Sequence, residues 1–342
     1  MKKIILIISI FLIPLNTYSI SASSMVVMDT DNKRVLMGYN EHTPRLIASI
    51  SKIMTAIIAI ENSNIEDTIK VSDIINKSFG SGIYIKVGEE IKLKDLLYGL
   101  MLRSGNDAAL MISEYTLGSV DNFVYTMNEY ANNLNMHNTI FINPHGLEDS
   151  KGNGNKSTSY DMALLTSYAI ENTTFRSIFK TKKYVCNTSR MKYVWYNKNK
   201  LLKYDYITGG KTGFTKKARR TLVTTGSKNN MNIVIVTLND RDDFNDHISL
   251  YNKIFKEYKS YNILDKNKFK IKKDKYYKKY KLYIKNNYNM TLKEKERKDI
   301  LIKIELIKYK KFNNDDIVGY VNIYLKDILY HKEPIYIRKN NG

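Results

Sequence analysis

The residue pattern changes near residue 258, and this change constrains the fold more than any other feature. Over residues 24–258, short β-branched runs alternate with stretches whose apolar residues recur at helical spacing. Farther on, around residues 300–309, apolar and charged residues alternate with a period near two, as in a half-buried strand. A chain of 342 residues can bury two cores. The sequence therefore predicts an α/β (α+β) domain over 24–258, followed over 259–342 by a basic linker and a small all-β, β-rich domain.

The C-terminal part gives two more specific expectations. Lysine is densest over residues 266–281, which we expect to form a linker that merges into a basic first strand. Residues 319–325 and 328–337 are expected to form a hairpin. Pro334 within it favours an edge position, because proline cannot donate a backbone hydrogen bond to a neighbouring strand.

The first residues have the layout of an export signal. Lys2 and Lys3 precede an uncharged apolar run over residues 4–15, and a polar segment follows. A helix needs roughly 20 residues to cross a bilayer, so this run is too short to span one. We therefore expect residues 1–23 to be a signal peptide cleaved near Ser21 to Ser23. The mature protein is then expected at the extracytoplasmic face of the cell membrane or in the cell wall.

The charge balance indicates anionic partners. Lysine and arginine number 55 against 34 aspartates and glutamates, a net charge of +21. Residues 262–342 hold 22 lysines and arginines against 10 aspartates and glutamates, a surplus of twelve positive charges. This surplus favours an anionic membrane surface or an anionic wall polymer, and compositional bias is the alternative. Export and the lack of a recognition motif argue against nucleic acid.

Cysteine and histidine usage excludes other classes of site. Cys186 is the only cysteine, so neither an intramolecular disulfide nor a thiolate metal cluster can form. The five histidines show neither H-x-x-x-H nor H-E-x-x-H spacing, which argues against a zinc peptidase. His145 is expected to be a structural hydrogen-bonding residue. We expect no cofactor and no metal.

A serine and a lysine lie three residues apart at the start of an apolar helical stretch. Ser49 and Lys52 stand in IASISKIMTA, and positions i and i+3 share one face of a helix. A lysine can activate a serine hydroxyl only if burial or nearby cations lower its pKa. An N-capping serine followed by a solvated lysine gives the same pattern, so this motif alone does not decide.

Two further polar motifs follow in order. Ser104 and Asn106 flank a glycine in MLRSGNDAAL, between two helical stretches, where both side chains could face a cleft. Lys211, Thr212 and Gly213 lie in ITGGKTGFT, which is expected at a sheet edge where a peptide could pair. Each motif alone is also compatible with a plain turn. The three are separated by 55 and 107 residues.

Together, the three motifs match the S-x-x-K, S-x-N and K-T-G set of penicillin-binding proteins and class A β-lactamases. The likeness extends into flanking segments, which are PRLIASISKIMTA, VGEEIKLKDLLYGLMLRSGNDAAL, NTIFINPHGLEDS, STSYDMALL and GGKTGFTKKARRTLV. Over residues 24–258 the chain resembles the low-molecular-mass D-alanyl-D-alanine carboxypeptidases, which are S11 serine peptidases. NDRDDFNDH, ahead of SLYNKIFKEY, resembles the sporulation-associated members most closely.

The resemblance implies a fold and a reaction. The fold would be a β-lactamase/DD-peptidase-like domain with a helix-flanked antiparallel sheet. Ser49 would form an acyl-enzyme on the penultimate D-Ala of a peptidoglycan stem peptide, with Lys52 as general base. Ser104 and Asn106 would help the proton return to the leaving D-Ala. β-Lactam antibiotics would acylate the same serine.

The third motif would bind the substrate. By the resemblance, Lys211 and Thr212 would bind the terminal carboxylate, and Gly213 would let the peptide backbone approach. The backbone N–H groups of Ser49 and Phe214 would form the oxyanion hole.

One departure from the family pattern leaves an alternative open. After the K-T-G strand the family usually reads A-G, whereas this chain has Ala218, Arg219 and Arg220. The alternative is therefore a catalytically weak protein that uses the cleft for cell-wall binding or sporulation assembly. No E-x-x-L-N sequence stands between the second and third motifs, which argues against a dedicated β-lactamase.

Overall fold

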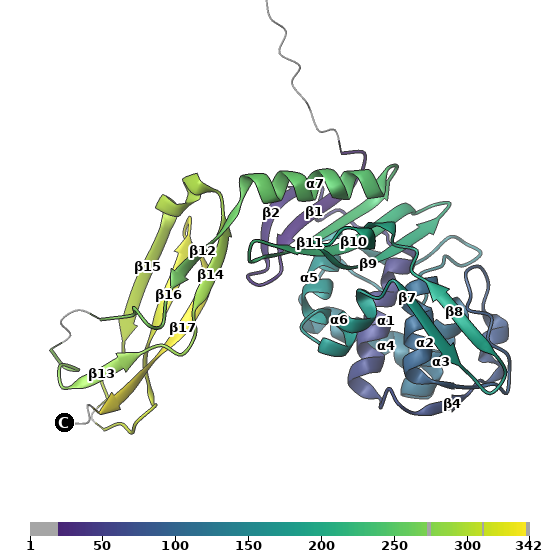
Figure 1. Cartoon of the computed structure of the whole chain (residues 1–342), viewed down its shortest axis with the longest axis horizontal. Coiled ribbons are helices and arrows are strands. Elements are labelled where there is room, and N and C mark those ends of the chain that lie inside the picture. The colour runs from purple at the N-terminus through teal and green to yellow at the C-terminus, as the bar shows by residue number, and fades with distance from the viewer. Residues whose placement is uncertain (1–19, 272–274, 310, 340–342) are drawn as a thin grey trace, which may run out of the picture.

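The computed structural model describes residues 20–271, 275–309 and 311–339. Residues 1–19 of the expected signal peptide lie outside the described residues. The described chain forms a larger unit of helices and antiparallel sheet and a smaller β unit, which meet near residue 258 (Figure 1). The predicted fold class is therefore confirmed. Among the described helices, none combines the length and apolar character that a bilayer crossing requires.

A five-stranded antiparallel sheet with strand order β2-β1-β11-β10-β9 organises the larger unit. Its strands are β1 (Ser24–Asp29), β2 (Arg34–Tyr39), β9 (Ile207–Thr215), β10 (Arg219–Lys228) and β11 (Met231–Asp240). β1 is buried on both faces. Val26 and Met28 join the core shared with the helices, whereas Met25 and Val27 join a second core. The sheet therefore forms the middle of three layers.

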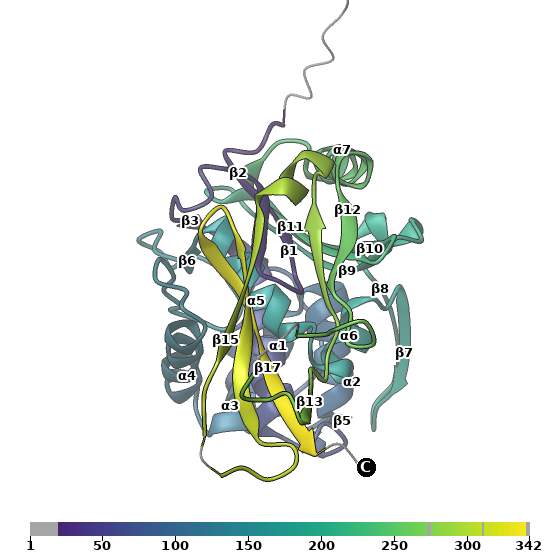
Figure 2. The same ribbon diagram turned by 90° about the vertical axis from the view of Figure 1, so that its left-hand side faces the viewer.

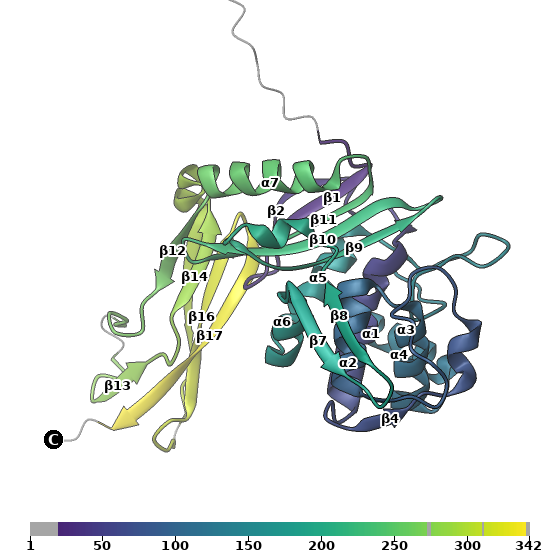
Figure 3. The same cartoon turned by 45° about the vertical axis from the view of Figure 1, so that its right-hand side comes forward.

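Helices cover both faces of this sheet (Figure 3). One face carries α7 (Asp243–Glu257), whose Leu250, Tyr251 and Ile254 complete the second core. The other face carries α1 (Lys52–Asn62), α5 (Ser159–Ala169) and α6 (Thr173–Phe179). Among these helices, α6 packs against β9 at the sheet edge, the strand expected to bind substrate.

Shorter elements complete the larger unit. They are β3 (Arg45–Leu46), η1 (Ala48–Ser51), β4 (Thr68–Lys70), η2 (Asp73–Lys77), β5 (Glu90–Lys92), α2 (Leu93–Tyr98), η3 (Gly99–Arg103), α3 (Asn106–Leu117), α4 (Val120–Asn133), β6 (Lys156–Ser157), β7 (Lys183–Asn187), β8 (Lys192–Tyr196) and η4 (Lys200–Lys203). Three two-stranded ribbons pair β3 with β6, β4 with β5, and β7 with β8.

The smaller unit packs two sheets around its own core. β12 (Lys259–Leu264) pairs with β14 (Tyr288–Leu292), and a four-stranded sheet has the order β13-β17-β16-β15. Its elements are β13 (Tyr280–Tyr283), η5 (Glu294–Asp299), β15 (Ile300–Leu306), β16 (Ile317–Leu325) and β17 (Ile328–Lys339). Met290, Val321 and Ile335 are fully buried between them. The predicted hairpin corresponds to β16 and β17.

Two details of this unit differ from the sequence-based expectation. Within the stretch expected to be a linker, Tyr277 is buried, and Phe269 and Ile271 pack against the core. The many lysines there masked these apolar anchors. β17 lies inside the sheet rather than at its edge, but β13 pairs only with residues 336–339 of β17. Pro334 therefore stands where the outer side of β17 has no strand partner.

Arg34 on β2 ties the two units together. Its guanidinium lies 2.5 Å from Glu296 Oε1 and donates to the Thr291 carbonyl, with side-chain exposures of 7% and 14% for Arg34 and Glu296. A second ion pair joins Lys293 Nζ to Glu257 Oε2 at 2.9 Å. Because the first pair is nearly buried, loss of one partner leaves polar groups without compensation.

We expect Arg34→Met to lower the free energy of unfolding by about 3 kcal/mol, because Glu296 and the Thr291 carbonyl would remain buried between the two units without their hydrogen-bond donor. Chemical denaturation measures this loss, and limited proteolysis near residue 258 should accelerate. Lys253→Met is the matched control, because the Lys253–Glu257 pair is about one-third exposed and should be worth under about 1 kcal/mol. Equal losses in the two variants would contradict the role of Arg34.

Candidate active site

Ser49 lies in the short 3₁₀ turn η1, which leads directly into α1. The preceding Ala48 has a left-handed backbone with φ of 49°, and the Ser51 hydroxyl donates to the Ala48 carbonyl at 2.8 Å. From β10, the Thr221 hydroxyl donates to the carbonyl of Ile47 at 2.9 Å. These contacts hold the turn against the sheet, with Ser49 half-buried at its surface.

Two glycines allow other backbone segments to approach this turn. A side chain at Gly213 on β9 would come within 2.9 Å of the Ser49 nitrogen. Gly146 has φ of +89°, and a Cβ there would lie 2.0 Å from the Ala48 carbonyl oxygen. Any larger residue at either position would therefore displace the serine turn.

Lys52 connects the first two motifs. Its Nζ lies 3.1 Å from Ser49 Oγ, 2.8 Å from Asn106 Oδ1 and 2.5 Å from the carbonyl oxygen of His145. The Asn106 amide nitrogen donates to the Phe79 carbonyl at 2.6 Å, which fixes the amide oxygen toward the lysine. Lys52 is fully buried. Its amine is thus held by three neighbours in a site without water contact.

The burial of the Lys52 amine favours its neutral form. Lys52 donates to all three neighbours, which are Asn106 Oδ1, the His145 carbonyl and Ser49 Oγ. The Ser49 hydroxyl lies 3.4 Å from the same His145 carbonyl. Burial first, and then the charges of Lys211 and Lys198, lower the pKa of Lys52 well below its ordinary value. The arrangement can therefore remove the Ser49 proton.

Ser104 and Lys211 form a second pair beside the first. Ser104 ends the π-helical turn η3 in a left-handed conformation with φ of 63°, which turns the chain sharply before α3. Its Oγ lies 3.1 Å from Lys211 Nζ, which also donates to the Thr212 carbonyl at 2.7 Å. Burial, assisted by the charge of Lys198, lowers the pKa of Lys211 to about 7. Burial thus lowers the pKa of both lysines.

The two pairs border one cleft of about 510 Å³. Ser49, Ser104, Thr212, Gly213 and Phe214 line it, whereas the amines of Lys52 and Lys211 are buried behind its wall. The Phe214 side chain is 60% exposed. The structure thus brings all eight residues singled out by sequence to one place. A larger hollow of about 1140 Å³ lies in the smaller unit, away from the motifs.

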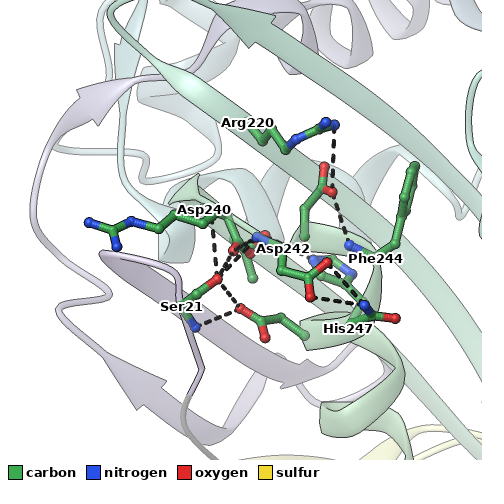
Figure 4. Close-up of polar contacts among 11 residues, drawn as sticks. Ser21, Arg220, Asp240, Asp242, Phe244 and His247 are labelled. Carbon is green, nitrogen blue, oxygen red and sulfur yellow. Dashed lines mark hydrogen bonds and ion pairs between the residues drawn. The ribbon is translucent and has the colours of Figure 1, made fainter.

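The departure after the K-T-G strand is accommodated locally. Arg219 adopts a left-handed φ of 61° at the turn between β9 and β10, the conformation for which glycine is the usual choice. Its side chain is exposed, so the cost is confined to backbone strain of about 1 kcal/mol. Arg220 points to the cleft rim, where its Nη1 lies 3.9 Å from Asp243 Oδ1 (Figure 4).

Sequence reasoning missed two carbonyl groups. The His145 backbone carbonyl accepts from Lys52 and, at 3.4 Å, from Ser49, whereas the expectation for His145 concerned its side chain. The His145 ring accepts from the Leu147 N–H, and burial lowers its pKa to about 3, so it is neutral. The Phe79 carbonyl orients Asn106. Every residue has a backbone carbonyl, so residue type could not identify these two groups. Only the positions of His145 and Phe79 in loops near the motifs could have suggested them.

The part of the cleft wall formed by residues 241–244 is braced by the start of the described chain (Figure 4). Ser21 donates from its hydroxyl to Asp240 Oδ1 and from its backbone N–H to Asp246 Oδ2, both at 2.7 Å. The Asp242 N–H donates to the same hydroxyl at 3.1 Å. Residues 241–244 line the cleft, so Ser21 fixes one of its walls in a chain that retains residue 21, whereas removal of residues 1–23 would delete this contact.

Comparison with known proteins identifies relatives of the larger unit. The model of the D-alanyl-D-alanine carboxypeptidase family, peptidase S11, matches residues 14–242. D-alanyl-D-alanine carboxypeptidase DacF of Bacillus subtilis is 32% identical over 63% of this chain and 56% of its own length. The D-alanyl-D-alanine carboxypeptidase of Streptomyces sp. K15 is 35% identical over 56% of this chain and 72% of its own. The chain thus spans little more than half the length of DacF.

A solved structure extends the likeness to the smaller unit. The D-alanyl-D-alanine carboxypeptidase DacD from Francisella tularensis superposes with a TM-score of 0.72 over 94% of both chains, at 23% identity, which shows a shared two-unit fold. The family match covers more than half of this chain and includes all three motifs. Together with the convergence of those motifs on one cleft, this establishes that the chain belongs to the D-alanyl-D-alanine carboxypeptidase family, peptidase S11.

Proposed function

We propose that the protein is an exported serine-type D-Ala-D-Ala carboxypeptidase that removes the terminal D-Ala from peptidoglycan stem pentapeptides and binds penicillin. One observation carries the proposal: Lys52 Nζ, fully buried, lies 3.1 Å from Ser49 Oγ while two carbonyl-type oxygens occupy its other hydrogen bonds. A buried amine in this state can act as the base that a serine nucleophile requires.

The proposed reaction has two covalent steps. Lys52 accepts the hydroxyl proton as Ser49 Oγ attacks the carbonyl carbon of the penultimate D-Ala. The backbone N–H groups of Ser49 and Phe214 stabilise the oxyanion. The peptide C–N bond then breaks, and the proton passes through Ser104 to the leaving amine. Water, deprotonated by the same lysine, hydrolyses the ester and restores the Ser49 hydroxyl.

Lys211 has a different task in this scheme. It is charged below a pH of about 7 and borders the cleft through Ser104 and Thr212. A charged amine beside a hydroxyl is suited to the terminal carboxylate of the substrate, which a carboxypeptidase must recognise. A bound carboxylate would in turn raise the pKa of Lys211 and keep it charged.

The alternative of a catalytically weak wall-binding or sporulation-assembly protein loses its motivating feature. It depended on Arg219 and Arg220; Arg219 adopts the left-handed backbone conformation for which glycine is the usual choice, and Arg220 lies at the cleft rim near Asp243. No observation at Ser49, Lys52 or Lys211 favours it.

We expect Ser49→Ala and Lys52→Ala each to reduce D-Ala release from a soluble D-Ala-D-Ala pentapeptide by about 10⁴-fold or more, because nucleophile and base act as a unit. The double variant should be little worse than either one. A coupled D-Ala assay measures this, with penicillin labelling in parallel. Turnover by folded Ser49→Ala protein would rule out the proposed nucleophile.

The pH dependence of acylation should report the charge of Lys198. Lys198 is one of the cations that lower the pKa of Lys52. Lys198→Gln should therefore raise that pKa, so that less Lys52 is neutral at low pH. We expect the acid limb of the penicillin acylation profile to move to higher pH by about 0.5 units.

Lys203→Gln is the matched control for this shift. It removes the same charge from the exposed end of the neighbouring turn η4. Its profile should superpose on that of the wild type. A Lys198→Gln profile that also superposes, or moves to lower pH, would mean that Lys52 does not set the acid limb.

We further propose that the smaller unit docks on an anionic membrane surface or wall polymer. Among the described residues, six cations and no acidic residue line its 1140 Å³ hollow; they are Lys266, Lys270, Lys275, Lys278, Lys281 and Arg338. The attraction of such a surface for polyanions falls with ionic strength, because the Debye length is about 8 Å at physiological salt.

Charge reversal tests this docking in the full chain. We expect Lys278→Glu with Lys281→Glu to weaken sedimentation with anionic vesicles or isolated sacculi, and the wild-type interaction to fall as salt rises. Lys192→Glu with Lys203→Glu, exposed lysines of the larger unit, is the control of equal charge. Equal weakening by both pairs would show that net charge rather than this hollow drives binding.

A further inference from the structure

The strand β15 forms an exposed edge of the four-stranded sheet. It pairs with β16 on one side, and the sheet order places no described strand on the other. Figure 1 shows β15 at the outer side of the smaller unit, and Figure 2 shows it in front of the larger unit. Leu301, Ile302 and Ile304 on this strand are each 44–45% exposed. A long apolar edge of this kind is usually protected in a monomeric protein.

The backbone groups that face outward can be assigned from the pairing. The Ile307 N–H donates to the Val318 carbonyl at 2.8 Å, and the Asp299 carbonyl accepts from the Lys326 N–H at 3.4 Å. Odd-numbered residues therefore direct their backbone groups toward β16, since these directions alternate along an antiparallel strand. The N–H and C=O groups of Ile302, Ile304 and Leu306 consequently face away from the sheet, where another strand could pair with them.

The two faces of β15 differ in character. Ile300 and Leu306 pack against the core of the smaller unit. Ile302 and Ile304 lie between these two residues on the same face, because side chains alternate between the faces of a strand, but each remains partly exposed. The opposite face carries Lys303 and Glu305. Among the ion pairs of the described residues, none includes Glu305.

The sequence of β15 is complementary to itself when two copies run antiparallel. A two-fold axis at Ile304 places Lys303 opposite Glu305 of the second copy, and Glu305 opposite its Lys303. The same register places Ile302 opposite Leu306, and Ile304 opposite itself. Axes at residues 303 or 305 would instead place like charges opposite each other, which destabilises a strand pair.

We propose that two copies of this chain associate through β15, antiparallel about Ile304, to form one continuous sheet that joins the smaller units of the two copies. Such an isologous contact uses the same strand in both copies and closes after two. The charges of β15 are balanced, whereas the cationic hollow borders β13 at the other edge of the sheet. The edge at β15 is thus suited to a second copy rather than to an anionic polymer.

A charge swap tests the pairing in the full mature chain. Analytical ultracentrifugation of the wild type, at about 0.15 and 0.5 M salt to screen the net charge, should show a concentration-dependent dimer. Lys303→Glu and Glu305→Lys should each weaken dimerisation at least about tenfold, because each places two like-charge pairs in the interface. The double variant Lys303→Glu, Glu305→Lys should restore it.

Three results would overturn the proposal: a wild type that is monomeric throughout, single variants that dimerise like the wild type, or a double variant that stays monomeric. Both side chains are exposed and lie outside the cleft, so D-Ala release should be unchanged in all variants, as should the thermal unfolding of each at concentrations where it is monomeric. These readouts distinguish failure of the pairing from failure of the proposed enzymatic function.

Cysteine crosslinking tests the register. Ile304→Cys should form an intermolecular disulfide on mild oxidation, because only at the axis do identical residues approach within about 4.4–6.8 Å between Cα atoms. Ile302→Cys is the matched control on the same face. The native Cys186 is buried and does not compete. Equal crosslinking at both positions would refute the Ile304 axis.

Discussion

Two buried lysines in one cavity set the constraint on which the rest of the site depends. Burial lowers the pKa of both amines, so it is costly to keep both of them charged side by side. The Lys52 amine donates to Asn106 Oδ1, the His145 carbonyl and Ser49 Oγ, and its burial favours the neutral form of a base. The pKa of Lys211 is lowered only to about 7, which leaves it available for an anion. In the proposed reaction, one lysine acts on the proton and the other on the carboxylate.

The fold maintains this difference by packing backbone against backbone. Gly213 brings β9 to the Ser49 turn, and Gly146 brings the loop that carries the His145 carbonyl to its other side. Asn106 is oriented from a third element through the Phe79 carbonyl. Because these contacts are backbone-to-backbone or to a fixed amide, the site has few side-chain rotamers left to order when substrate binds.

The sequence predicted the parts that depend on local spacing. The i, i+3 relation of Ser49 and Lys52, the break at Ser104 and the strand at Lys211 follow from periodicity and short motifs, and the family resemblance indicated that they meet. The His145 carbonyl and the Ser21 brace depend on contacts across more than 90 residues, which no local pattern records. The many lysines around Tyr277 likewise led to the prediction of a linker where apolar side chains pack into the core of the smaller unit.

The protonation state of Lys52 at neutral pH is the central claim, and an NMR titration of the lysine side chains tests it most directly. The ¹³Cε resonance of Lys52, assigned by its loss in a Lys52→Met variant, should have the shift of a neutral amine at pH 7. Its midpoint should lie below that of Lys211. A Lys52 midpoint near the ordinary lysine value of about 10.4 would contradict the account, because the base would then be charged and unable to accept the serine proton.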